Sequence, residues 1–423
     1  MRLRSAAPTL FALALYLGAC GDGATPEAGT VIRTDTIGDT IVVRSDQTGV
    51  WEGTATLEPR VTIGTFDGPP ETVFGSVNSL AGGADGEVYV LDRQAIEIRV
   101  FDRTGTYLRT IGREGGGPGE MGQPMSIGVY PDGRVGARDP QNGRLQLWTA
   151  EGEPDGEWPV VSPRDFSGDP LWVDEDGRSW VVTKGFSTDP TRPAPNVVVR
   201  VDRDGTVLDT LSDPGAYAER PEVTVSDPER GTLSSSMTLP FFPGGSWAVH
   251  PSGAIVRTTS DGEGVEMVRE DGTVRRYVRA AEPVPIPDAQ RMESRRTIEE
   301  RMRDVDPSWR WDGPDLPLEK PHAMRVWAGE GGRIWTMIST PSRQIENPFH
   351  DPEMPGSRPM AWTQPVAFDV FEADGTYLGR VDAPEAFVTY PAPVFFEDGV
   401  WATTRDDLGV QRVVWWDLVL PRQ

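Results

Sequence analysis

The chain has 423 residues, with 47 glycines, 39 prolines and a hydrophobic content of 37%. This length suffices for one large domain or two ordinary ones, and the glycine and proline content favours many turns over long helices. The formal net charge of −24 argues against non-specific nucleic-acid binding, which needs a basic surface, and against adhesion to anionic membranes. We therefore expect no nucleic-acid partner.

The N-terminus is typical of a targeting segment. Arg2 and Arg4 precede the apolar stretch 10–17, which is too short to span a bilayer. Residues 17–20 read Leu-Gly-Ala-Cys, which resembles the lipobox of bacterial lipoproteins. In that motif the cysteine is lipidated and becomes the mature N-terminus. An ordinary secretory signal that is cleaved nearby is the alternative.

Cys20 is the only cysteine of the chain, so lipid attachment fits it better than a redox or metal role. We predict a signal peptide over 1–19 and a flexible tether over 20–52, rich in glycine, threonine and aspartate, with one weak strand over 39–44. We also predict a location in the cell envelope, facing the periplasm or the cell exterior. The lipid anchor would be the only contact with the membrane, because acyl chains supply the anchoring free energy themselves.

From residue 76 onward a unit of roughly 40–50 residues recurs. Each unit has a tight glycine turn followed by a β-rich strand, at Asp85-Gly86, Asp132-Gly133, Asp176-Gly177, Ser252-Gly253, Gly331-Gly332 and Asp398-Gly399. A second glycine turn closes five units, at Thr104-Gly105, Glu151-Gly152, Asp204-Gly205, Asp271-Gly272 and Asp374-Gly375. Glycine suits such hairpins because they need a positive φ. Short strands and tight turns at this period predict a β-propeller.

The ends of the chain are predicted to close the ring. The sixth unit lacks its second glycine turn, and its last strand, over 412–420, runs almost to the C-terminus. Residues 53–64 alternate like a strand but have no partner nearby, so they can supply the missing strand and remove an exposed edge. We predict an all-β, six-bladed propeller over 53–423, with blades that start near residues 76, 124, 170, 243, 321 and 390.

The first two units resemble the NHL repeat. The resemblance rests on Asp85-Gly86, Val88-Tyr89-Val90, Asp92, Val100-Phe101-Asp102, Ile111-Gly112 and the glycine-rich 115–120, and in the second unit on Asp132-Gly133, Asp139, Asn142 and Arg144-Leu145. The match is good over 76–156 and weaker afterwards. The whole chain resembles bacterial lipoproteins that are described only as six-bladed β-propeller proteins. That resemblance implies a fold and an envelope location, and it implies no activity.

The long connections are predicted to lie on one face of the propeller. In a four-stranded meander all the glycine turns share one face, which leaves the insertions 212–242, 281–320 and 340–363 on the other. Function on a rigid scaffold concentrates in such loops. In the second insertion, Arg–Glu pairs at helical spacing predict a helix over 288–305. Its apolar positions are sparse, so we expect it to lie across the surface rather than in a core.

The candidate binding residues come from these insertions and from the strand opening between them. Tryptophan and arginine are enriched at binding sites, which makes exposed copies in loops informative. The candidates are Trp309, Arg310, Trp311, His322, Arg343, His350 and Trp362. For the tryptophans, capping of the core is the alternative role. For His322, a hydrogen-bonded position in the pore is favoured over a role as a general base.

The sequence holds few signs of catalysis. In NHL-type peptidyl-hydroxyglycine lyases, Pro-His pairs from several blades supply zinc ligands, but here Pro321-His322 has no counterpart in the other blades. Gluconolactonase-like propellers hold calcium around the pore, and only Asn78 and Asp169 are candidates for that position. We predict no catalytic residues, no cofactor and no metal ligands, with a divalent cation in the channel as the alternative.

Two functions remain open beside a purely structural role in the envelope. The first is a non-catalytic, lipid-anchored propeller that binds a protein, peptide or glycan through its long-loop face. The second is a divalent-cation-dependent hydrolase or lyase with its site at the central channel. The residue pattern favours the first function and does not identify the ligand.

Overall fold

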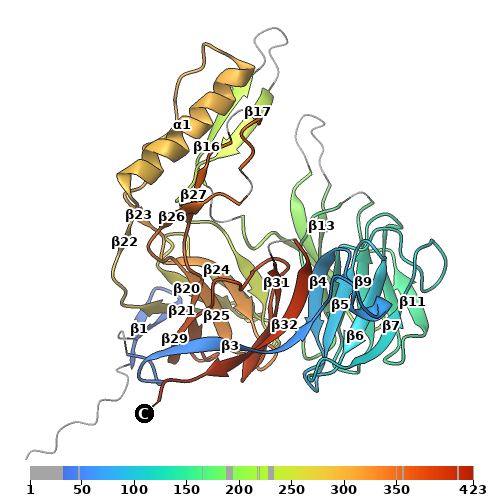
Figure 1. Cartoon of the computed structure of the whole chain (residues 1–423). Helices are drawn as coiled ribbons and strands as arrows, with labels where there is room; N and C mark the ends of the chain where they lie inside the picture. Colours follow the sequence, from blue (N-terminus) through green and yellow to red (C-terminus); the bar gives the residue numbers. More distant parts are fainter. Residues whose placement is uncertain are drawn as a thin grey trace, which may run out of the picture.

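A computed structural model shows how the strands are arranged (Figure 1). It describes residues 32–45, 48–163, 165–186, 194–216, 218, 220–226, 233–348, 350–354, 357–406 and 409–422. The predicted signal peptide, the lipidation site Cys20 and the first part of the predicted tether lie outside the described residues.

Six antiparallel meanders of four strands follow one another around a central axis. From the innermost strand outward, the first three blades are β4 (Val77–Gly82), β5 (Val88–Asp92), β6 (Glu97–Phe101) and β7 (Tyr107–Ile111); β8 (Ser126–Val129), β9 (Val135–Asp139), β10 (Arg144–Trp148) and β11 (Pro154–Trp158); and β12 (Leu171–Val173), β13 (Ser179–Lys184), β14 (Asn196–Val201) and β15 (Val207–Ser212). The next two are β18 (Trp247–Val249), β19 (Ile255–Thr258), β20 (Gly264–Val268) and β21 (Val274–Arg279); and β24 (Ala323–Ala328), β25 (Ile334–Ile338), β28 (Ala367–Phe371) and β29 (Tyr377–Asp382). The sixth is β30 (Val394–Phe395), β31 (Gly399–Arg405), β32 (Gln411–Val419) and the N-terminal strand β3 (Thr54–Ile63). The chain is a six-bladed β-propeller, as the repeat predicts.

The strand β3 closes the ring as the sequence predicts. It pairs antiparallel with β32 from Thr56, opposite Val419, to Ile63, opposite Val413. Its side chains Ala55, Leu57 and Ile63 are buried in the blade interfaces. The first and last strands of the propeller therefore share one blade, and the edge of β32 is covered.

The prediction of a tether over 20–52 is wrong for residues 32–45. These residues form a hairpin of β1 (Ile32–Ile37) and β2 (Thr40–Ser45), and β2 adds parallel to β21 at the outer edge of the fourth blade. Val42 and Val43 are buried there, which gives the hairpin an apolar contact that a tether lacks. The weak strand predicted over 39–44 is present as β2, whereas the composition gave no sign of β1 or of a partner strand more than 200 residues away.

The core consists of one apolar cluster between each pair of neighbouring blades. Trp335 of the fifth blade stacks on Phe395 of the sixth, with ring centroids 4.6 Å apart. Trp401 and Trp415 of the sixth blade share the next buried cluster with Val88 of the first blade. Such face-to-face packing of sheets leaves the inner strands as a rigid wall around the axis.

The three long insertions assemble into one structure, which we call the insertion body. It consists of β16 (Glu222–Ser226), β17 (Leu233–Thr238), β22 (Val284–Pro285), α1 (Asp288–Val305), β23 (Glu319–Lys320), β26 (Arg343–Glu346) and β27 (Met360–Thr363). Figure 1 shows α1, β16 and β17 standing away from the blades, with β26 and β27 beside them. All three insertions therefore occupy one face, as the parity of the meander predicts.

The helix α1 has the predicted bounds but not the predicted environment. Ion pairs join Arg295 to Glu299 at 3.0 Å and Arg303 to Glu299 at 2.9 Å, at the spacing that predicts the helix. Ile298 and Met302, however, are buried against the hairpin β16–β17. The expectation that α1 lies across the surface outside any core is therefore wrong, because a second insertion supplies a small core of its own. Among the described residues, no helix is both long and apolar enough to cross a bilayer.

Candidate functional site

The central axis opens on the loop face into a cavity of about 480 Å³. Every blade contributes to its wall, through residues on or just before the inner strands: Asn78, Ser126, Asp169, Trp247, Arg325 and Tyr390. Asn78 and Asp169 are the two residues that the sequence marks as channel-facing. The volume lies within the range of small-ligand sites, roughly 300–1,000 Å³.

Tryptophans from successive inner strands form an aromatic side of this cavity. Trp172 on β12 and Trp247 on β18 both line it, with their ring centroids 4.4 Å apart and their planes tilted by 34°. Trp327 on β24 lines it as well and packs edge-on against Phe368. The three indoles are partly buried, so each is anchored in a blade interface and still reaches the cavity.

Two arginines stand at the edge of the cavity without a protein partner. Arg325 projects from β24, and Arg220 precedes β16 and lies against the backbone of Gly244. Both are exposed. Within the part of the chain that the structure describes, neither guanidinium makes a hydrogen bond or an ion pair. Their charges are therefore available to a ligand.

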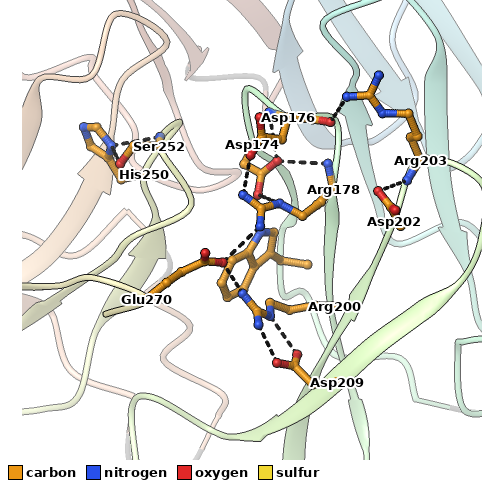
Figure 2. Close-up of polar contacts among 11 residues, drawn as sticks. Asp174, Asp176, Arg178, Arg200, Asp202, Arg203, Asp209, His250, Ser252 and Glu270 are labelled. Carbon is orange, nitrogen blue, oxygen red and sulfur yellow. Dashed lines mark hydrogen bonds and ion pairs between the residues drawn. The ribbon is translucent and has the colours of Figure 1, made fainter. Parts of the chain in front are cut away.

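Arginines in the blade walls behave differently, as the close-up in Figure 2 shows. Arg178 bonds Asp174 at 3.0 Å and Glu270 at 3.0 Å, which joins the third blade to the fourth. Arg200 pairs with Asp209 and with the same Glu270. The hydrogen bonds from Arg200 hold the pKa of Asp209 below its ordinary value despite partial burial. Paired guanidinium groups of this kind are structural, because a ligand would have to displace an internal carboxylate.

A second hollow of about 430 Å³ adjoins the first and shares Arg220, Gly244, Met324 and Arg325 with it. We call the two hollows together the cleft. The insertion body supplies the far side of the second hollow, through Phe241, Phe242, Gln290 and Trp362. Phe241 has a φ of 71°, a region that bulky residues rarely adopt, so its neighbours hold the backbone in this conformation.

Lys320 adds a third cation, in the second hollow. Its ammonium group donates to the carbonyl oxygen of Thr340 at 2.7 Å and to Oε1 of Gln364 at 2.5 Å, both of them neutral acceptors. Burial lowers the pKa of Lys320 to about 8, because the charged form loses hydration. Among the described residues that line the cleft, the only carboxylate is Asp169. The cleft is therefore locally cationic in a chain of net charge −24.

Comparison with known proteins agrees with this architecture. Residues 72–133 match the model of the DUF5128 family, described as a 6-bladed beta-propeller, and no curated protein matches the chain. A solved member of the DUF4221 family from Bacteroides vulgatus has a TM-score of 0.51 and 10% identity, covering 87% of this chain and 99% of its own.

Two solved enzymes show weaker likeness. A virginiamycin B lyase from Staphylococcus aureus has a TM-score of 0.41 and 10% identity, over 86% of this chain and 100% of its own. A gluconolactonase from Xanthomonas campestris has a TM-score of 0.38 and 13% identity, over 86% and 97%.

The tryptophans after the helix do not lie in the cleft. Trp309 is only 8% exposed, and its Nε1 donates to the carbonyl oxygen of Thr224 at 2.9 Å, inside the insertion body. Trp311 is partly buried, packs edge-on against Trp309, and lies under the guanidinium of Arg295 at 4.6 Å. Arg310 is exposed between them and donates to the carbonyl oxygen of Ser308 at 2.9 Å. For both tryptophans the structure matches the capping alternative, with the core of the insertion body in place of the propeller core.

His322 does not line the channel either. Its Nε2 lies 2.8 Å from Oδ2 of Asp369, a carboxylate that is 1% exposed. Arg279 donates to the same oxygen at 2.8 Å, and the hydroxyl of Tyr377 donates to Oδ1 at 3.0 Å. Burial alone would raise the pKa of Asp369, but the hydrogen bond from His322 and the charge of Arg279 hold it below its ordinary value. The expectation that His322 faces the pore is wrong, because a buried carboxylate between the fourth and fifth blades holds it.

Of the candidates in the third insertion, one reaches the cleft. Trp362 lines the second hollow and donates from Nε1 to Glu293 of α1 at 3.0 Å. Arg343 is exposed and pairs with Glu385 at 2.8 Å. His350 is exposed and its Nδ1 lies 3.1 Å from the hydroxyl of Ser357. The candidates are therefore dispersed over the insertion body rather than gathered at one site.

Sequence reasoning missed the residues that do meet in the cleft, namely Trp172, Arg220, Trp247, Lys320 and Arg325. A usable signal existed for the residues on inner strands, because the first strand of each blade faces the axis and three of these strands carry a tryptophan. For Arg220 and Lys320 no such signal exists, because their positions depend on how the insertions fold. Across the described residues, no three histidine, cysteine, aspartate or glutamate side chains are grouped so as to hold a metal ion.

Proposed function

We propose that this chain is a lipid-anchored envelope protein that binds a ligand in the cleft on its long-loop face, without catalysing a reaction. The observation that carries the proposal is the lining of the cleft. It combines tryptophans from rigid inner strands with arginines that have no partner among the described residues. Both residue types supply much of the binding energy at interaction sites. The N-terminal sequence supports the anchor, and the candidate ligands are proteins, peptides and glycans.

Blocking the cleft tests this proposal. Ala392 is partly exposed and lines the first cavity, so Ala392→Trp should narrow its mouth. Ala373 lies in a glycine turn on the opposite face, so Ala373→Trp is the matched control. The full-length proteins, purified in detergent, are used to capture ligands from native envelope extract, which are identified by mass spectrometry and glycan analysis. We expect wild type and Ala373→Trp to retain the same ligand and Ala392→Trp to lose it.

Equal recovery by all three proteins would contradict a binding site in the cleft. A melting curve of Ala392→Trp that matches wild type is required, and Met324→Trp, which faces both hollows, serves as an independent second block. The divalent-cation-dependent hydrolase or lyase remains the alternative hypothesis. Stoichiometric metal in the purified full-length protein would favour it over the binding function.

A further inference from the structure

We propose that the ligand of the cleft is an acidic carbohydrate, a sugar chain that carries carboxylate groups. The inference rests on the proposed function, since it names the ligand class of the same site. It depends on three features of the cleft: guanidinium groups and polar atoms that have no partner among the described residues, and tryptophans in the wall.

The guanidinium groups select a carboxylate. A planar guanidinium offers parallel N–H donors that match the two oxygens of a carboxylate, and such charge-assisted pairs are stronger than neutral hydrogen bonds. Arg325 and Arg220 each line both hollows, and no described residue competes for their donors. The nearby acid, Asp169, lies close enough to the buried Arg138 to interact with its charge, so part of its repulsion is offset.

The walls suit a sugar ring. One face of a pyranose ring presents C–H groups, which pack on an indole, while its hydroxyls point outward to polar atoms. Trp172 and Trp247 pack on each other with ring centroids 4.4 Å apart, and this indole pair lines the first cavity. Nearby, the amide nitrogen of Asn78 donates to Met125 at 2.7 Å, whereas its Oδ1 and the hydroxyl of Tyr390 have no partner among the residues the structure describes. These atoms can accept from and donate to sugar hydroxyls.

The two hollows set the length of the ligand. Their volumes, about 480 and 430 Å³, meet at the arginines, so one ligand can fill both with a carboxylate at the junction. Lys320 in the second hollow gives a further carboxylate a cationic contact. A chain of at least two acidic sugars therefore uses all three cations, and affinity should rise from the monosaccharide to the short oligomer.

Isothermal titration of the full-length protein in detergent tests the ligand class. The probes are defined oligomers of galacturonate, glucuronate and mannuronate, their methyl esters, and an acidic peptide. We expect at least one uronate oligomer to bind, with its methyl ester weaker by roughly tenfold or more, because the ester loses the charge that the arginines recognise. Arg325→Met should weaken binding by a similar factor and Arg325→Lys by less, since lysine keeps the charge without the planar fork.

Arg60→Met is the matched control, because Arg60 is an exposed arginine on the outer strand β3. It should bind like wild type, and melting curves show whether each variant folds. The inference is overturned if no uronate oligomer binds, if methyl esters bind equally well, or if the acidic peptide alone binds and depends on Arg325. In each of these cases the capture experiment still tests the proposed function. If wild type captures a ligand from envelope extract and Ala392→Trp does not, the proposed function stands. If Ala392→Trp captures the same ligand as wild type, the proposed function itself is contradicted.

Discussion

Asp369 shows how this protein uses buried charge for structure. Arg279 comes from the fourth blade and Tyr377 from the fifth, and both bond this carboxylate together with His322. Removing one partner from such a buried group leaves the others uncompensated, which destabilises the fold. A loss of activity in His322→Ala would therefore not identify a catalytic histidine, because the same variant weakens the contact between two blades.

His250 gives the clearest pH dependence at the residue scale. It is 6% exposed, its Nδ1 accepts from the backbone N–H of Ser252 at 3.1 Å, and its Nε2 lies 2.9 Å from the carbonyl oxygen of Gly332 (Figure 2 shows its contact with Ser252). Burial lowers the pKa of His250 below its ordinary value, because the cation would lose its hydration. The folded protein therefore holds this side chain neutral, with the proton on Nε2.

The sign of the effect follows from linkage. Below the unfolded pKa of about 6.5 the unfolded chain binds the proton and the folded chain does not, so stability falls as pH drops from there toward the lowered folded pKa. We expect the free energy of unfolding in urea to decrease between roughly pH 7 and pH 5, and His250→Gln to remove part of this slope. His350→Gln, at an exposed histidine, is the control. Equal slopes for wild type and His250→Gln would contradict the assignment.

At the scale of single elements, the strand β3 decides whether the ring stays closed. Leu57 is 3% exposed in the cluster between the fifth and sixth blades, whereas Glu58 on the same strand is exposed. We expect Leu57→Ala to lower the free energy of unfolding by roughly 2–5 kcal/mol, the usual cost of such a cavity. Glu58→Ala should change it little. Urea unfolding monitored by tryptophan fluorescence measures both, and similar values for the two variants would mean that β3 does not hold the blades together.

Elements with local signals could be predicted from the sequence, and elements that depend on distant partners could not. The strand β3 and the helix α1 each follow from spacing within a few residues and are present as predicted. Ten of the eleven predicted glycine turns have the positive φ, and the exception is Gly399, which begins β31. Of the hairpin β1–β2, only a weak strand over 39–44 could be predicted, because the hairpin is stabilised by its contact with β21. Trp309 was misjudged for the same reason, since its burial depends on Thr224 in another insertion.

The cleft illustrates this limit for function. Arg325 lies on an inner strand and could have been suspected, but its importance depends on Arg220, which lines the same two hollows. Arg220 is 105 positions earlier and belongs to an insertion. A binding site assembled between a repeat scaffold and irregular insertions leaves no compact motif, because its parts come from stretches that are distant in the sequence.

At the scale of the whole molecule, the insertion body is a second small core attached to the propeller. Val223 and Val225 of the hairpin pack with Ile298 and Met302 of α1, and Trp309 completes this cluster. The third insertion is tied to it through Arg358, which pairs with Glu293 of α1 at 3.2 Å. Because the insertion body supplies one side of the second hollow, loosening this core should weaken ligand binding without any contact between ligand and core.

Trp309→Ala separates the two cores. We expect it to destabilise the insertion body by roughly 3–5 kcal/mol, since a buried tryptophan and its hydrogen bond to Thr224 are lost, while the blades keep their stability. Hydrogen exchange followed by mass spectrometry should show faster exchange in α1, β16 and β17 and unchanged exchange in β5, β9 and β31. Arg310→Ala, at the exposed neighbour, should leave both regions unchanged.

Faster exchange in the blades as well would mean that the two cores unfold together. Unchanged exchange in α1 would mean that Trp309 is dispensable for the insertion body. If the prediction holds, reduced ligand capture by Trp309→Ala reflects a distorted second hollow and not a lost contact at Trp309. The decisive comparison is then with Arg325→Met, which removes a charge from the cleft and leaves both cores intact, because Arg325 is exposed and has no partner among the described residues.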